Sequence, residues 1–362
     1  MLLERMLENT LGLQAIPAPT GQEGPRAARL RDLLAEAGLD QIERDDLGNL
    51  YAATTAECTH PITVVSAHLD SVFPPEQNRP AERKGNRLIG PGIGDNALGL
   101  SVLIELAYDL QDMPVDGCVW LVANVAEEGM GNLEGMRAVV ERFRDAPRAY
   151  LVLEGLGLGQ LYHQALPARR YRIRAETEGG HAWIHANRPS AIHALLHLGT
   201  ALAEMKLPKN PRTTLNIGLV QGGTSVNTIA DHAIMEVDIR SYRADALTQI
   251  EMAMRKLCAQ ASGRQVRIFC ETVGERPSGG IPADHPLVRA AAAALNRQGV
   301  RPARAMPAST DASIPLSLEL PALCMGLTQG AGAHSQNEYI EIDPIRKGYA
   351  AVLEVIGWLM AQ

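Results

Sequence analysis

The chain has 362 residues, of which 46% are hydrophobic and 4% aromatic, so it holds enough aliphatic material for more than one compact core. Its formal net charge of −7, without a cluster of Lys and Arg, argues against a nucleic-acid-binding protein, because phosphate binding needs concentrated positive charge. No apolar run reaches the roughly 18 residues of a membrane span, and the charged N-terminus lacks the apolar stretch of a secretion signal.

The cysteine pattern agrees with a soluble protein of the reducing cytoplasm. The five cysteines are odd in number, widely spaced and never arranged as Cys-x-x-Cys, so they predict neither a disulfide framework nor a thiolate zinc site. They are Cys58, Cys118, Cys258, Cys270 and Cys324.

Two helices are predicted in the first part of the chain. Residues 25–37 carry leucines at helical spacing and are followed by Gly38, a typical helix stop. Residues 97–110 are apolar nearly all round, as in a buried helix. This second helix begins just after Asp95, so we expect Asp95 at a helix N-terminus.

Four short, continuously apolar runs are typical of buried parallel strands, and each is followed by potential metal ligands. In an open α/β sheet, ligands collect beyond the carboxyl ends of the strands, so these side chains could converge. A single histidine or glutamate pair has an ordinary structural explanation, but the repetition indicates a metal-dependent enzyme. The runs and the residues after them are 64–67 with His68 and Asp70, 119–124 with Glu127 and Glu128, 150–153 with Glu154, and 322–327 with His334.

The pattern changes after residue 166. Alternating, strand-like segments and two helical segments predict an antiparallel α+β domain with its helices on one face. The segments are strands at 171–177, 213–219, 225–229, 233–240 and 265–272, and helices at 189–204 and 244–261. Residues 277–282 resemble a linker, and helices at 285–296 and 344–360 complete the first domain. We therefore predict one domain from residues 1–166 and 283–362, with residues 167–282 inserted in it.

The ordered motifs resemble those of the dinuclear zinc amidohydrolases and metallopeptidases that include aminoacylase, acetylornithine deacetylase, succinyl-diaminopimelate desuccinylase, carboxypeptidase G and tripeptidase T. The resemblance implies an α/β fold, a zinc-peptidase-like catalytic domain with a central mixed, mostly parallel sheet flanked by helices. It also implies that the insertion is a ferredoxin-like α+β lid and dimerisation domain. The motifs are His68-Leu69-Asp70, Gly94-Asp95, Glu127-Glu128-Gly129, Glu154, Gly179-Gly180-His181 and residues 333–339.

The resemblance also implies two divalent metal ions. His68 and Glu154 would bind one ion, Glu128 and His334 the other, and Asp95 both. Zinc is the expected metal, and cobalt or manganese would accept the same ligands.

Two further carboxylates receive roles from the resemblance. Asp70 would accept the second ring proton of His68 and so fix its tautomer. Glu127 would act as general base toward a water held between the ions, and would return the proton to the leaving amine.

Four other residues are candidates for substrate or transition-state contacts. Asn227 and Arg240, on successive predicted strands, would clamp a substrate carboxylate, although Arg240 alone reads as a surface strand residue. His181 would stabilise the oxyanion in the neighbouring subunit of a homodimer, unless it is a solvated loop histidine. Asp311 would lie near the substrate pocket or cap the following turn.

The predicted activity is hydrolysis of an amide bond, peptide or N-acyl, in a small substrate with a free carboxylate. Glu154 favours the deacylase and carboxypeptidase branches, because the dipeptidase and tripeptidase branches tend to carry Asp there. A zinc aminopeptidase or tripeptidase is an alternative, although the aminopeptidase insertion usually precedes the bridging aspartate. A metal-binding module without catalysis is another, against which the retained Glu127 argues. We expect a small peptide or N-acyl amino acid as partner, and neither nucleic acid nor membrane.

Overall fold

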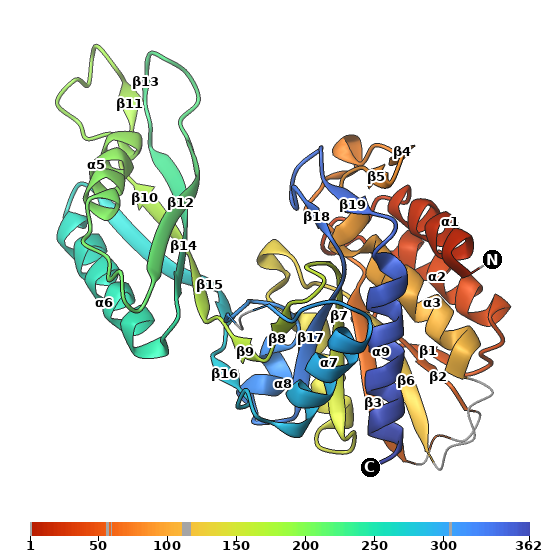
Figure 1. The fold of residues 1–362 in the computed structure, drawn as a ribbon. Helices are drawn as coiled ribbons and strands as arrows, with labels where there is room; N and C mark the ends of the chain where they lie inside the picture. The colour runs from red at the N-terminus through yellow and green to blue at the C-terminus, as the bar shows by residue number, and fades with distance from the viewer. Residues whose placement is uncertain (1, 56–57, 59, 111–116, 304–305) are drawn as a thin grey trace. The chain divides into compact units, whose positions relative to one another are not determined.

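The computed structural model describes residues 2–55, 58, 60–110, 117–303 and 306–362, and it divides into two compact units (Figure 1). Unit 1 comprises Met1–Ala165 and Gly279–Gln362, and unit 2 comprises Leu166–Ser278. The chain thus returns to unit 1 at Gly279, earlier than the predicted residue 283. The reason is local pairing, because β16 (Gly279–Gly280) pairs with β9 (Gln164–Ala165) inside the stretch predicted as a linker.

Unit 1 is built on a seven-stranded mixed sheet in the order β1-β2-β6-β3-β7-β17-β8 (Figure 1). Its four neighbouring strands β6, β3, β7 and β17 run parallel, while the outer pairs are antiparallel. These four strands are the four predicted apolar runs, so the predicted mixed sheet is confirmed. The strands are β1 (Ile42–Arg44), β2 (Leu50–Ala53), β3 (Pro61–His68), β6 (Cys118–Asn124), β7 (Ala149–Leu156), β8 (Leu161–Tyr162) and β17 (Ala322–Thr328).

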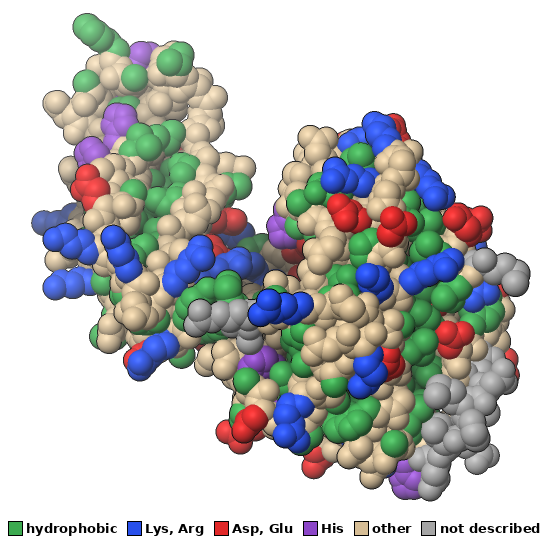
Figure 2. All heavy atoms as spheres, viewed as in Figure 1, with side chains coloured by type: hydrophobic (Ala, Val, Ile, Leu, Met, Phe, Trp, Pro, Cys, Tyr) green, Lys and Arg blue, Asp and Glu red, His purple; other side chains and the backbone are tan. Residues whose placement is uncertain are grey.

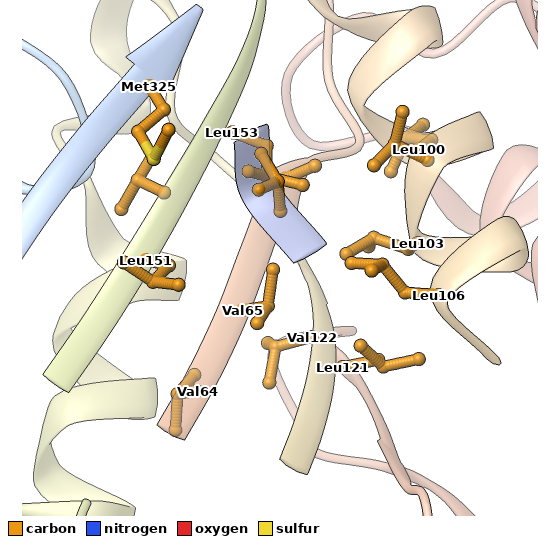
Figure 3. Packing of buried hydrophobic residues seen from close by; sticks show 14 of the residues in the cluster. Val64, Val65, Leu100, Leu103, Leu106, Leu121, Val122, Leu151, Leu153 and Met325 are labelled. Atoms are coloured by element: carbon orange, nitrogen blue, oxygen red, sulfur yellow. The ribbon is translucent and has the colours of Figure 1, made fainter. Parts of the chain in front are cut away.

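Helices cover both faces of this sheet, which explains why the central strands are apolar throughout. On one face, Leu103 and Leu106 of α3 face Val65 and Leu121 (Figure 3). On the other face, Trp120 packs against Phe143 of α4, with ring centroids 5.4 Å apart. The helices of unit 1 are α1 (Leu2–Gln14), α2 (Gly24–Glu36), α3 (Leu98–Leu110), α4 (Glu134–Phe143), α7 (Pro286–Arg297), α8 (Ser313–Ser317) and α9 (Ile345–Met360).

A second, small sheet of unit 1 has the order β18-β19-β5-β4. It joins the segment before Asp95 to the segment around His334, which are far apart in the sequence. The strands are β4 (Glu82–Lys84), β5 (Arg87–Ile89), β18 (Gly330–Ala331) and β19 (Tyr339–Glu341).

Unit 2 has a four-stranded antiparallel sheet in the order β12-β14-β10-β15, with two helices packed on it (Figure 1). This order and the βαββαβ succession are those of a ferredoxin-like fold, as predicted. The elements are β10 (Ala168–Glu176), α5 (Ala191–Ala203), β12 (Thr213–Gly222), β14 (His232–Ser241), α6 (Ala244–Ala261) and β15 (Arg267–Arg276). The two short strands β11 (Gly180–His181) and β13 (Thr228–Ile229) pair with each other.

Two expectations need correction. Helix α3 begins at Leu98, and Asp95 has non-helical backbone angles, so Asp95 precedes the helix instead of starting it. Cys58 and Cys118 form a disulfide, with Cα atoms 5.5 Å apart, which the odd and scattered cysteine count did not predict because the pairing depends on the fold. Within the described residues, no helix combines the length and hydropathy needed to cross a bilayer.

Candidate metal centre

Three neighbouring parallel strands bring four of the predicted residues to one edge of the sheet. His68 is the last residue of β3, and Glu154 lies near the end of β7, the strand beside it. Glu127 and Glu128 follow the end of β6, which pairs with β3 on its other side. The geometry arises from parallel pairing, since parallel strands place their carboxyl ends at the same edge.

Asp95 lies at the centre of this group, with each carboxylate oxygen facing a different histidine. On one side, Asp95 Oδ1 is 3.0 Å from His68 Nε2, which is also 3.8 Å from Glu154 Oε2. On the other side, Asp95 Oδ2 is 3.2 Å from His334 Nε2, which is 3.1 Å from Glu128 Oε1. The five predicted ligands therefore form two groups that share Asp95.

These separations fit divalent metal ions. Zinc lies about 2.0–2.2 Å from nitrogen and oxygen ligands, so two ligands of a tetrahedral ion are roughly 3.3 Å apart. The histidine–carboxylate distances of the two groups, 3.0 to 3.8 Å, bracket this value. Ligand atoms of His68, Asp95 and Glu128 all lie within 4.8 Å of one another. The donor set of imidazole and carboxylate groups is also the one that zinc prefers.

In the metal-free protein, the histidine rings at this edge are surrounded by carboxylates. Burial would lower the pKa of His68, but hydrogen bonds to Asp70, Asp95 and Glu154 raise it well above its usual value. Hydrogen bonds to Asp95 and Glu128 raise the pKa of His334 to about 10. Burial raises the pKa of Glu154, against the effect of His68. A cation that binds here would replace the imidazole protons as the partner of the carboxylates.

The Asp70 carboxylate accepts several hydrogen bonds from the backbone and side chains around the site. Its carboxylate accepts the backbone N–H of Glu127 (3.0 Å) and of Glu128 (2.8 Å), together with the Thr20 hydroxyl (2.7 Å). His68 Nδ1 lies 3.1 Å from the backbone oxygen of Asp70 and 3.4 Å from its carboxylate. Asp70 therefore holds the Glu127–Glu128 segment as well as the His68 ring, which extends the role expected for it.

Some positioning side chains were not identified from the sequence. Asn96 donates to the backbone oxygen of Leu153 (2.8 Å) and accepts from the N–H of Gly155 (3.1 Å), so it clamps the strand on both sides of Glu154. The buried Arg26 donates to the backbone oxygen of Leu69 (2.8 Å), between His68 and Asp70. No local sequence signal marks these contacts, because each joins segments distant in the chain.

Asp311 is fully buried, and its carboxylate interacts electrostatically with His68, Glu154 and Asp70. Asn124 donates to its Oδ2 at 2.7 Å, and burial raises the pKa of Asp311 to about 7. The next turn uses the backbone oxygen of Asp311, which accepts from Ile314, instead of its side chain. The side chain therefore does not cap the turn, and its proposed place near the substrate pocket stays a prediction.

The candidate residues of unit 2 lie at its two ends. His181 and Asn227 share one end, where β11 pairs with β13 and the N–H of Ala182 donates to Asn227. Asn227 precedes β13 and is not on a strand, contrary to prediction. Arg240 lies near the far end of β14, where Asp238 accepts both arms of its guanidinium. Since a strand advances about 3.3 Å per residue, Asn227 and Arg240 of one chain are roughly 25 Å apart and do not meet.

Comparison with known proteins supports the kinship of the whole chain. The family model described as "Peptidase family M20/M25/M40" matches residues 64–357. A succinyl-diaminopimelate desuccinylase from Corynebacterium glutamicum is 25% identical over 367 residues, which cover 95% of this chain and 94% of that protein.

Solved structures share the fold over nearly the full length. A tripeptidase from Staphylococcus aureus has a TM-score of 0.79 at 22% identity, with 99% of both chains covered. A dinuclear metal-binding peptidase of the M20 family from Bacillus subtilis has a TM-score of 0.69 at 18% identity, again with 99% of both chains covered.

Proposed function

The chain belongs to peptidase family M20/M25/M40, and from this premise we propose that it hydrolyses an amide bond in a small substrate with a free carboxylate. The bond is a peptide bond or an N-acyl bond, and two divalent metal ions, zinc in the first place, assist the reaction. The observation that carries the proposal is the position of Asp95. Its two oxygens face two separate histidine–carboxylate groups, as a ligand shared by two ions requires.

The ligand roles follow from this grouping. His68 and Glu154 would hold one ion, Glu128 and His334 the other, and Asp95 both. When bound, the ions would polarise the amide carbonyl and lower the pKa of a water molecule toward neutrality.

Glu127 would act as the general base. It is buried beside the proposed ligand Glu128, and its backbone N–H donates to the Asp70 carboxylate. We propose that its carboxylate takes the proton from the attacking water and transfers it to the leaving amine nitrogen. Asp70 serves this step by holding the Glu127 backbone, and a shift of Asp70 would move both the base and the ligand Glu128.

A hydrolysis panel tests the proposal. With zinc supplied, the enzyme should cleave N-acetyl amino acids, N-succinyl amino acids or dipeptides, and a blocked substrate carboxylate should reduce cleavage strongly. Cleavage of peptides with a free amino terminus, insensitive to carboxylate blocking, would instead indicate an aminopeptidase or tripeptidase. Two bound ions without cleavage of any substrate would indicate a metal-binding module.

We further propose a homodimer formed through unit 2. Exposed hydrophobic side chains lie near His181 and Asn227, among them Trp183, which is 87% exposed, and Val226. Figure 2 shows hydrophobic side chains on the surface at the end of unit 2 that carries β11 and β13. Such a patch on a monomer favours association. His181 and Asn227 of one chain would then serve the active site of its partner, together with the partner's own copy of the arginine at position 240.

Light scattering tests the association. The expected mass is that of two chains, and Trp183→Ser should shift it toward one chain. As a control, Phe269→Ser replaces an exposed aromatic side chain on β15, outside the two short strands, and should leave the mass unchanged. A single-chain mass for the unmodified protein would reject the dimer.

A further inference from the structure

We propose that Glu338 is a positioning residue that holds Asp95 in the geometry needed to serve two metal ions. The inference depends on the proposed two-metal role of Asp95, and Glu338 is not one of the proposed ligands. Its fully buried carboxylate accepts three backbone N–H groups of the loop that carries Asp95. Oε1 accepts from Gly94 (2.7 Å) and from Asp95 itself (2.9 Å), and Oε2 accepts from Gly92 (3.1 Å).

The acceptor is itself fixed by the small sheet. Glu338 immediately precedes β19, and Gly90 immediately follows β5, the strand that pairs with it. The backbone oxygen of Glu338 accepts the N–H of Gly90 at 2.8 Å. The hydrogen-bonded pairing of β5 with β19 therefore extends to Glu338, the residue whose side chain binds the Asp95 segment. Glu338 thus ties the position of the small sheet to the segment that leads into the irregular turn Ile93–Ala97.

The loop needs such an anchor. Gly92 has a backbone φ of +70°, and both Asp95 and Asn96 have non-helical backbone angles. Glycine-rich backbone is conformationally permissive, whereas metal and catalytic groups must be held within about 0.5 Å of their productive positions. For Asp95 the demand is double, because an error in its backbone displaces both oxygens at once.

The same hairpin carries a proposed ligand. His334 lies between β18 and β19, with its Nε2 3.2 Å from Asp95 Oδ2. Glu338 therefore fixes the position of the Asp95 backbone relative to the hairpin that carries His334. This explains how segments about 240 residues apart in the sequence reach one site in register.

The chemistry favours a carboxylate at position 338. In the described part of the chain, no Lys or Arg forms an ion pair with Glu338, so its partners are the backbone donors. When ionised, the carboxylate has only acceptors, and three converging N–H groups match them. A glutamine would keep Oε1 for Gly94 and Asp95 but would point its NH2 group, a donor, at the N–H of Gly92.

Two variants and two readouts test the inference. The variants are Glu338→Gln and Glu338→Ala, and Glu341→Gln is the matched control. Glu341 is the last residue of β19, three positions after Glu338, and its side chain pairs with Arg87 at the surface. The first readout is zinc affinity by competition with a chromophoric chelator. The second is amide hydrogen exchange of residues 90–97 in the metal-free protein.

The expected order of zinc affinity is wild type, then Glu338→Gln, then Glu338→Ala. The alanine variant should lose roughly 10- to 100-fold, as changes behind metal ligands typically do, and both ions should weaken because Asp95 is shared. Exchange in residues 90–97 should accelerate in the same order while the core strands stay protected. A buried carboxylate without a positioning role would leave the affinity unchanged or weaken it only in proportion to global unfolding.

The outcomes separate this inference from the proposed function. If the wild type binds two ions but cleaves nothing, the proposed hydrolysis is wrong. The zinc-affinity and hydrogen-exchange measurements still test whether Glu338 positions Asp95. If both folded variants bind zinc and exchange as wild type does, the inference is overturned even when hydrolysis is normal. Should Glu338→Ala not fold, Glu338→Gln decides by the same criteria.

Discussion

The substitution Glu127→Gln separates the proposed base from the proposed ligands. Glutamine keeps the size of the side chain, and the backbone N–H of Glu127 can still donate to Asp70. The amide cannot take a proton from water, so turnover should fall while the metal site remains. General acid–base catalysis contributes about 10²- to 10⁴-fold. At about 1.36 kcal/mol per tenfold change, this raises the barrier by roughly 3–5 kcal/mol. We expect the upper end, because Glu127 serves both proton transfers.

Glu128→Gln is a closely matched control. Glu127 and Glu128 are each 6% exposed, and Asp70 binds the backbone of both. They differ in that Oε1 of Glu128 lies 3.1 Å from Nε2 of His334. Steady-state kinetics and zinc content by mass spectrometry should show an inactive Glu127→Gln that retains its zinc. Glu128→Gln should lose zinc and recover part of its activity in excess metal. A Glu127→Gln variant that keeps more than a tenth of the activity, or that loses its zinc, would rule out Glu127 as the base.

Three further predictions address the shared ligand, the protons and the core. Asp95→Asn should weaken binding of both ions, whereas His334→Ala should weaken one; equal stoichiometry in a zinc titration of the two variants would contradict this. Because metal binding needs neutral imidazoles and the pKa values of His68 and His334 are raised in the metal-free protein, binding should release protons and weaken as the pH falls. Calorimetry in buffers of different ionisation enthalpy would show no buffer dependence if this is wrong. Leu103→Ala, in the packed face of α3 (Figure 3), should lower the free energy of unfolding by about 2–5 kcal/mol, and a urea titration showing a loss below about 1 kcal/mol would contradict the packing.

The sequence was most informative about the sheet edge. Buried parallel strands carry apolar residues on both faces, so the run ending at His68 could be recognised without any long-range information. The strand before Glu154 could be recognised for the same reason. Since parallel strands share an edge, the convergence of these side chains follows from the strand assignment.

The supporting contacts could not be predicted, because they join residues far apart in the chain. Glu338 binds the Asp95 loop, and Asn96 binds the strand around Glu154, through side-chain to backbone hydrogen bonds that no local pattern marks. Asp311 appeared in a motif, but only the fold shows that its carboxylate is buried. The separation of Asn227 from Arg240 likewise depends on the length and direction of β14.

The most direct test of the two-metal centre is a crystal structure of the zinc-loaded protein with anomalous data at the zinc edge. We expect two peaks per chain, about 3.5–4 Å apart, with one oxygen of Asp95 directed at each. One peak should lie beside His68 and Glu154, and the other beside Glu128 and His334. A single peak, or peaks away from Asp95, would show that Asp95 does not bridge two ions.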